Sequence, residues 1–202
     1  MTTAPKKKTT KSRATTTTNK KLTPIPELPK NPLAFEVLDL VSKQRTKAKK
    51  IEVLKKYEDL SIKIILIWNF DESVISMLPQ GDVPYSRFED QNVNKGTFSN
   101  KLTEEVRRMY ESGSFSMGSS DKQGRTTIRR ESKSFYYFIK GGNDGLSTIR
   151  RETLFINILE GLHPLEAEIL CLVKDKKLSD KYKITKEIVA EAYPDIKWGG
   201  RS

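Results

Sequence analysis

The stretch of sequence that decides the fold contains one pattern twice: residues 127–142 read TIRRESKSFYYFIKGG, and residues 148–161 read TIRRETLFINILEG. Each copy begins with a threonine suited to a helix cap, carries an Arg pair in the first turn, continues with aromatic or aliphatic residues and stops at glycine. Two such segments joined by a short turn predict an antiparallel helical hairpin. Their apolar residues predict that this hairpin forms the centre of the core.

The sequence around the repeat also favours helices. Asn31 followed by Pro32 is a typical helix start, which predicts a helix to about residue 42. Thr46 is expected to cap a second helix that runs to about residue 59 and has one apolar and one lysine-rich face. Residues 61–70 fit a strand, because several are β-branched, or a buried helix, and the helical neighbours favour the helix. Further short helices are predicted at residues 71–78, at 103–110, from Pro164 to about residue 174, and at 185–192.

The two ends and the middle of the chain lack such patterns. Residues 1–30 consist mainly of Thr, Lys, Ala and Pro, and a segment of this kind buries too little apolar surface to offset the entropy of ordering. We therefore predict a disordered basic arm at 1–30, with a proline linker at its end, and a C-terminal tail at 197–202. The predicted fold class is mostly α: a compact multi-helix bundle at 31–196 with a largely irregular central segment at 79–124.

The net charge of +11 is concentrated in two places. Residues 1–30 hold eight Lys and Arg against one Glu, a net charge of +7, and residues 41–56 hold seven Lys and Arg against one Glu, a net charge of +6. Residues 31–40 contribute −2, and the charges of the remaining chain cancel. Clustered lysines attract polyanions by releasing counterions, without sequence preference.

These cations are the candidate contacts to a nucleic acid, together with the Arg pairs of the repeat. A solubilising tail, an assembly arm on a protein partner and a merely solvated lysine face remain alternatives. Acids nearby can also explain the Arg pairs, and at most one Arg of each pair can face a given ligand, because adjacent helical residues point about 100° apart. The candidate residues are Lys6, Lys7, Lys8, Lys11, Arg13, Lys20, Lys21, Lys43, Arg45, Lys47, Lys49, Lys50, Arg129, Arg130, Arg150 and Arg151.

The aromatic run of the first copy permits two interpretations. Phe135 and Phe138 are expected in the core, since four successive aromatic residues surround a helix. Tyr136 and Tyr137 lie beside basic residues and can either join the core or stack on nucleotide bases.

No pattern in the sequence predicts catalysis, a cofactor or a metal ion. Cys171 is the single cysteine, which excludes an internal disulfide and a cysteine-based zinc site and favours a reducing compartment. His163 precedes Pro164 and is expected to cap a helix. The longest apolar run, residues 64–68, is too short to span a bilayer, and the basic N-terminus lacks the apolar segment of a secretory signal. We therefore expect neither an enzyme nor a membrane partner.

One string, RETLFINILEGLHPLEAE at residues 151–168, resembles a family of small, functionally uncharacterised proteins from T4-type tailed bacteriophages, notably those of marine cyanobacteria. The resemblance covers roughly half the chain and extends to residues 31–57, 71–85, 150–178 and 184–196. It implies a phage protein that acts in the host cytoplasm or is carried in the virion, and it transfers no catalytic residue. The Lys/Thr-rich arm and the Ser/Gly-rich loop at 112–124 fall outside it.

Together these features predict a non-enzymatic phage protein that associates with nucleic acid or with a nucleic-acid-bound complex, such as replication or transcription machinery. The bundle would then contact a phage or host protein. An alternative is a virion structural or assembly component that uses its N-terminal arm to bind a capsid or neck partner. A remote alternative is an inhibitor of a host enzyme or defence system. The sequence predicts no oligomeric state.

Overall fold

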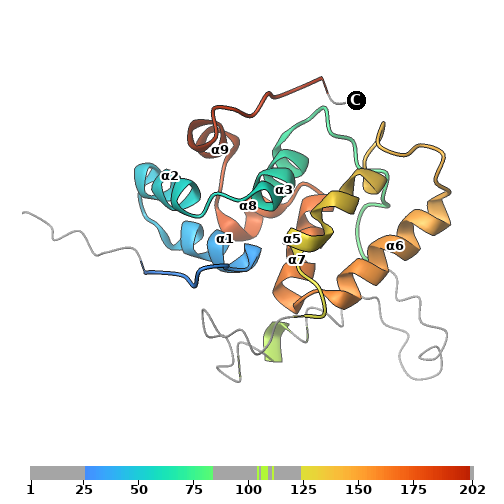
Figure 1. Ribbon diagram of the computed structural model, residues 1–202, viewed down its shortest axis with the longest axis horizontal. Coiled ribbons are helices and arrows are strands. Elements are labelled where there is room, and N and C mark those ends of the chain that lie inside the picture. Colours follow the sequence, from blue (N-terminus) through green and yellow to red (C-terminus); the bar gives the residue numbers. More distant parts are fainter. Residues whose placement is uncertain (1–25, 84–103, 105, 109–110, 112–123, 201–202) are drawn as a thin grey trace, which may run out of the picture.

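The computed structural model describes residues 26–83, 104, 106–108, 111 and 124–200, and its fold is mostly α, a multi-helix bundle as predicted (Figure 1). Its only β pairing among these residues is an isolated antiparallel bridge between Ser76 and Ile139. The elements are α1 (Ala34–Lys43), α2 (Lys47–Lys56), α3 (Leu60–Phe70), α5 (Ile128–Glu131), the 3-10 helix η3 (Ser132–Phe138), α6 (Thr148–Gly161), α7 (Pro164–Lys174), α8 (Leu178–Tyr182) and α9 (Lys186–Ala192).

Helix α7 lies at the centre of the bundle. It packs against α1, α3, α6 and α8, while α2 packs against α1 and α9. The second helix of the repeat, α6, packs against α7 and η3. As Figure 1 shows, α2 and α6 therefore lie at opposite ends of the molecule.

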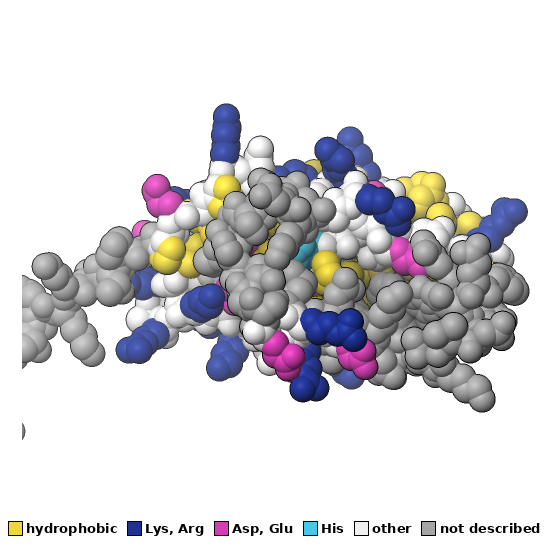
Figure 2. All heavy atoms as spheres, turned by 90° about the horizontal axis from the view of Figure 1, so that it is seen from below, with side chains coloured by type: hydrophobic (Ala, Val, Ile, Leu, Met, Phe, Trp, Pro, Cys, Tyr) yellow, Lys and Arg dark blue, Asp and Glu magenta, His cyan; other side chains and the backbone are white. Residues whose placement is uncertain are grey.

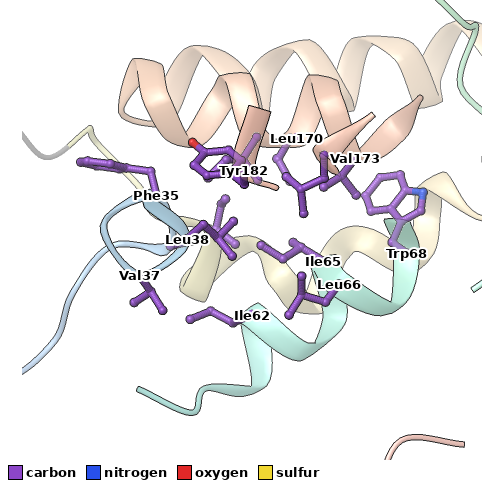
Figure 3. Packing of buried hydrophobic residues seen from close by; sticks show 14 of the residues in the cluster. Phe35, Val37, Leu38, Ile62, Ile65, Leu66, Trp68, Leu170, Val173 and Tyr182 are labelled. Carbon is purple, nitrogen blue, oxygen red and sulfur yellow. The ribbon is translucent and has the colours of Figure 1, made fainter. Parts of the chain in front are cut away.

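The core joins side chains from helices far apart in the sequence. Leu38 of α1, Ile65 of α3 and Leu170 of α7 are fully buried and point toward one another in Figure 3. Asn69 of α3 is also buried, and its side-chain oxygen accepts a hydrogen bond from the Leu178 amide at 3.1 Å. This bond holds the start of α8 against the end of α3.

Aromatic residues of the repeat lie within this core, as the sequence predicted for Phe135 and Phe138. The Phe138 ring stacks on Trp68 with 6.1 Å between ring centroids and meets Phe155 edge-on at 5.2 Å. Phe135 lies 5.8 Å from the same Trp68 ring. Both copies of the repeat thus supply the buried aromatic cluster.

The first copy of the repeat is not the α-helix that we predicted. After the single α-helical turn of α5, the chain tightens into η3. Residues three apart eclipse one another in a 3-10 helix, so that Ser132, Phe135 and Phe138 form one buried ridge. This spacing places both phenylalanines in the core. The predicted helix in the second copy is confirmed as α6.

The predicted helix at residues 71–78 is also wrong. Asp71 ends α3, and its carboxylate accepts hydrogen bonds from the backbone amide of Ser73 at 3.0 Å and from that of Gly199. The following residues are held by distant backbone: the Met77 amide donates to the Phe138 carbonyl at 2.7 Å, and the Lys140 amide donates to the Ile75 carbonyl at 2.9 Å. These pairs replace the hydrogen bonds of a local helix.

Several predicted boundaries shift as well. Helix α1 begins at Ala34 because the Glu36 carboxylate accepts the Leu33 amide at 2.8 Å, which makes Leu33 the cap in place of Asn31. Helix α2 ends at Lys56, and Asp59 instead caps α3, which confirms the helical interpretation of residues 61–70. Helix α8 was not predicted.

The predicted arm is shorter than 30 residues. Leu28 packs against the core, and its amide donates to the Tyr57 hydroxyl at 2.9 Å. The predictions for residues 1–25, 84–103 and 112–123 lie outside the described residues. Of the helix predicted at 103–110, Glu104 and 106–108 are described, and they are helical.

Candidate nucleic-acid interface

The lysine-rich helix α2 forms for local reasons. The Thr46 hydroxyl accepts the Lys49 amide at 3.4 Å, as predicted for an N-cap. Ile51, Val53 and Leu54 are buried against α1 and α9. The remaining positions of α2 are polar except for Ala48, and they leave the lysines at the surface.

The fold gathers five of the predicted cations and adds one that sequence reasoning missed. Lys183 ends α8 in a left-handed conformation, and its carbonyl accepts a hydrogen bond from Lys50 Nζ at 2.6 Å. No local pattern indicates this contact, because 133 residues separate the two partners. Figure 2 shows Lys and Arg side chains projecting from the end of the molecule that holds α1 and α2. We call the following set the α2 basic surface: Lys43, Arg45, Lys47, Lys49, Lys50 and Lys183.

Two lysines of the α2 basic surface form ion pairs with acidic side chains. Lys43 pairs with Asp39 and Lys47 pairs with Glu191, each at 2.6 Å. The two lysine side chains are 57% and 54% exposed, and ion pairs this exposed contribute only about 0–1 kcal/mol. A phosphate can therefore replace either carboxylate at little cost. Lys50 donates to the Lys183 carbonyl, and this neutral partner leaves its charge in place.

The two Arg pairs of the repeat differ: Arg129 and Arg130 are both exposed, whereas in the second pair Arg151 is buried and Arg150 is exposed. Arg129 contacts Asp59 at 2.8 Å and donates to the Pro32 carbonyl at 3.3 Å. Arg130 and Arg150 are exposed. The interpretation that at most one Arg of each pair can face a given ligand stays a prediction.

Arg151 does not belong to a phosphate clamp, and its prediction as a nucleic-acid contact is wrong. Its side chain is 2% exposed. Its guanidinium donates to the carbonyls of Tyr137, Asn143 and Leu146 at 2.8 to 3.0 Å. Arg151 thereby fastens the turn of the hairpin to the first turn of α6.

Glu166 is the most enclosed carboxylate among the described residues, with 1% exposure. Its two oxygens accept hydrogen bonds from the amides of Ala34 and Ile128, each at 3.0 Å. These amides begin α1 and α5, and Glu166 itself lies in the first turn of α7. Its carboxylate therefore lies near the N-termini of three helices, where the helix dipole favours a negative charge. Burial raises the pKa of Glu166, although the two amides and Arg129 oppose the shift. This residue joins helices and is not placed for catalysis.

A small pocket lies between the loop after α3 and helices α6 and α7. Lys174 Nζ, on a side chain that is 2% exposed, donates to the carbonyls of Pro79 and Gly81 and to Asp175 at 2.7 to 2.8 Å. The space that remains is about 20 Å³, which suits one water molecule. Lys174 thus anchors a loop.

His163 and Cys171 have the structural positions that the sequence predicted. The His163 ring caps α7 by accepting the Leu165 amide at 3.1 Å, and it stacks on Phe35 with 4.7 Å between centroids. Cys171 packs against the core, where burial raises the pKa of its thiol to about 12. A thiol with this pKa is a poor nucleophile at neutral pH.

Two negative findings concern only the described ranges. There, no group of three or more His, Cys, Asp or Glu side chains is arranged to hold a metal ion. No helix in the same ranges combines the length and apolarity needed to cross a membrane. Seven candidate cations of the predicted arm lie outside these ranges and stay predictions: Lys6, Lys7, Lys8, Lys11, Arg13, Lys20 and Lys21.

The fold and surface define a small helical protein with a basic surface at one end. Comparison with known families gives one match: a family of unknown function, DUF6433, matches residues 37–125 and 119–180. The chain belongs to this family. The matched residues include α2 and both copies of the repeat. No curated protein and no solved structure matches the chain.

Proposed function

We propose that this member of the DUF6433 family is a non-enzymatic protein that associates with nucleic acid or with a nucleic-acid-bound complex. The observation that carries the proposal is the α2 basic surface, where exposed and half-buried cations from the end of α1, from α2 and from the residue after α8 lie at one end of the bundle. Phosphates attract such cations without sequence preference. The cations of residues 1–25 add to the same attraction.

The resemblance to proteins of T4-type phages supports a phage origin, with the host cytoplasm or the virion as the place of action. In this proposal the basic surface holds the protein near nucleic acid, and another part of the bundle contacts a phage or host protein. The enclosed pocket at Lys174 and the buried Glu166 are structural, and neither contributes to binding.

The test is a titration of fluorescent duplex DNA at about 50 and 200 mM salt. The logarithm of affinity falls with the logarithm of salt concentration by about 0.9 per phosphate contact. The charge reversal Lys47→Glu, Lys49→Glu, Lys50→Glu should therefore flatten this slope by about 3 and weaken binding at low salt at least about tenfold.

A matched control separates local binding from overall charge. Arg125→Glu, Lys177→Glu and Lys197→Glu change the net charge equally, but at exposed positions scattered over the molecule. This variant should lose much less affinity than the α2 variant. Salt-independent binding, or equal losses in both variants, would rule out the α2 basic surface as the contact.

A further inference from the structure

The rings of Tyr136 and Tyr137 form a tilted pair on η3. Their ring centroids lie 4.1 Å apart with 34° between the ring planes. Tyr136 is 43% exposed, whereas Tyr137 is partly buried against the core. A hydrogen bond with Tyr137 raises the pKa of Tyr136. One ring is thus held in place by its neighbour and offers a face to solvent.

The backbone beneath this pair is fixed. Arg151 Nε donates to the Tyr137 carbonyl at 2.8 Å, which ties η3 to the first turn of α6. A Cβ atom on Gly142 would collide with the Tyr136 carbonyl, so the turn lies directly against η3. Phe135 and Phe138 anchor the same helix from its buried side.

Three exposed cations lie on η3, just after it and in the adjoining first turn of α6. Lys133 precedes Tyr136 by three residues, and in a 3-10 helix this spacing places both side chains on one ridge. Lys140 follows η3, and Arg150 adjoins the fixed Arg151. All three cations are exposed, and none forms an ion pair with another described residue. At the end of the molecule that α6 occupies, Figure 2 shows exposed hydrophobic side chains with Lys or Arg beside them.

An exposed aromatic ring among cations has the chemistry that binds unpaired nucleotides. We propose that this tyrosine surface, made of Tyr136, Tyr137, Lys133, Lys140 and Arg150, binds single-stranded nucleic acid: a base stacks on Tyr136, and the cations contact the flanking phosphates. Paired bases in a duplex are already stacked and cannot reach the ring.

The tyrosine surface lies on η3, which packs against α5 and α6, whereas α2 packs against α1 and α9. The α2 basic surface needs only phosphates, whereas the tyrosine surface needs an unpaired base. An experiment can therefore rule out base stacking at the tyrosine surface without ruling out phosphate binding by the α2 basic surface, and the reverse.

The experiment compares fluorescent oligonucleotides of about 12 nucleotides on the full chain: oligo-dT, oligo-rU, an abasic strand of the same length, and a duplex. The intact protein should bind oligo-dT or oligo-rU about tenfold more tightly than the abasic strand, which is the gain expected from one stacked base. The two homopolymers distinguish DNA from RNA as the source of that base.

Variants make the result specific to the ring. Tyr136→Ala should abolish the preference over the abasic strand, whereas Tyr136→Phe should keep it, and duplex affinity should change in neither. Leu60→Ala is the matched control, because Leu60 is 71% exposed and lies in α3. Photo-crosslinking with 5-iodouracil strands should label the peptide that contains Tyr136. Equal affinity for the abasic strand, no effect of Tyr136→Ala, or crosslinks confined to α2 would overturn the proposal.

Discussion

Glu166 shows how a single side chain can connect helices that begin far apart in the sequence. A carboxylate has two acceptor oxygens, and here each one receives a helix-starting amide, from Ala34 and from Ile128. The amides are buried with it, so that neither has water as an alternative partner. No sequence pattern predicts this, because the partners lie 132 and 38 residues away.

Glu166→Gln should destabilise the protein, although the two side chains have nearly the same shape. The amide side chain keeps one acceptor and replaces the other with an NH₂ group, which would face a buried N–H donor. One unsatisfied donor costs about 1–3 kcal/mol of the free energy of unfolding, measurable by urea denaturation. Glu168→Gln, in a half-buried pair with Lys181, should cost less than about 1 kcal/mol. Equal losses would contradict the role given to Glu166.

The lowered pKa of the Asp59 carboxylate should make the stability of the protein depend on pH. Burial alone would raise its pKa, but the hydrogen bonds from Ser61 and the contact with Arg129 outweigh burial and lower the pKa below its ordinary value. A carboxylate with a lowered folded-state pKa stabilises the fold above its unfolded pKa of about 3.9 and loses that contribution as the pH falls through the folded value.

The free energy of unfolding of the wild type should therefore decrease as the pH drops below about 4, and Asp59→Asn should decrease less. Asparagine also caps helices well, so this variant keeps the start of α3 and removes mainly the charge. Chemical denaturation at several pH values measures both curves. Parallel curves would show that Asp59 is not one of the groups responsible.

At the scale of elements, local signals were predictable and distant ones were not. The caps Thr46 and His163 were found from sequence, because a cap acts within three residues of itself. The prediction for residues 71–78 was wrong because their backbone partners lie at the end of η3 and just after it, more than 60 residues later. The 3-10 conformation of η3 lets Phe135 and Phe138 both pack against Trp68. The local sequence does not show this contact, because Trp68 lies far away in the chain.

In the turn between η3 and α6, one added methyl group should lower the stability of the protein. In Gly142→Ala the new Cβ would meet the Tyr136 carbonyl, and backbone cannot rotate aside as a flexible side chain can. Overpacking of this kind costs about 1–3 kcal/mol. Gly145→Ala is the matched control in the same turn, since its nearest neighbour, Asn143 Oδ1, is 3.8 Å away. Thermal unfolding of the two variants should separate them, and similar melting temperatures would refute the close approach.

At the scale of the whole molecule, the bundle separates its two basic regions. The α2 basic surface lies on a helix that packs against α1 and α9, whereas the tyrosine surface lies on η3, which packs against α5 and α6. The sequence predicted five of the six cations of the α2 basic surface, because charge clustering is local. It named Tyr136, Tyr137 and Arg150 as candidates, but not the hydrogen bond from Arg151 to the Tyr137 carbonyl that ties η3 to α6.

The C-terminal segment after α9, which includes most of the tail predicted at 197–202, contributes to holding the bundle together. Ile196 is buried, Trp198 packs against the core, and the Gly199 amide donates to the Asp71 carboxylate at 3.0 Å. Asp195 contacts Lys63 at 2.8 Å, so the segment follows α3 from its first turns to its end. Removing the segment would expose the apolar surface that it covers.

Truncation after Tyr193 should therefore lower the free energy of unfolding by about 1–3 kcal/mol, the contribution of one well-buried aliphatic side chain. Ile196→Ala in the full chain should account for much of this loss, because Asp195 is 64% exposed on its side chain and its ion pair contributes little. Truncation after Gly200 is the control, since it leaves every one of these contacts intact. Urea denaturation of the three variants measures the effect. If truncation after Tyr193 left the unfolding midpoint unchanged, the contacts of Ile196 and Gly199 would contribute nothing to the stability of the bundle.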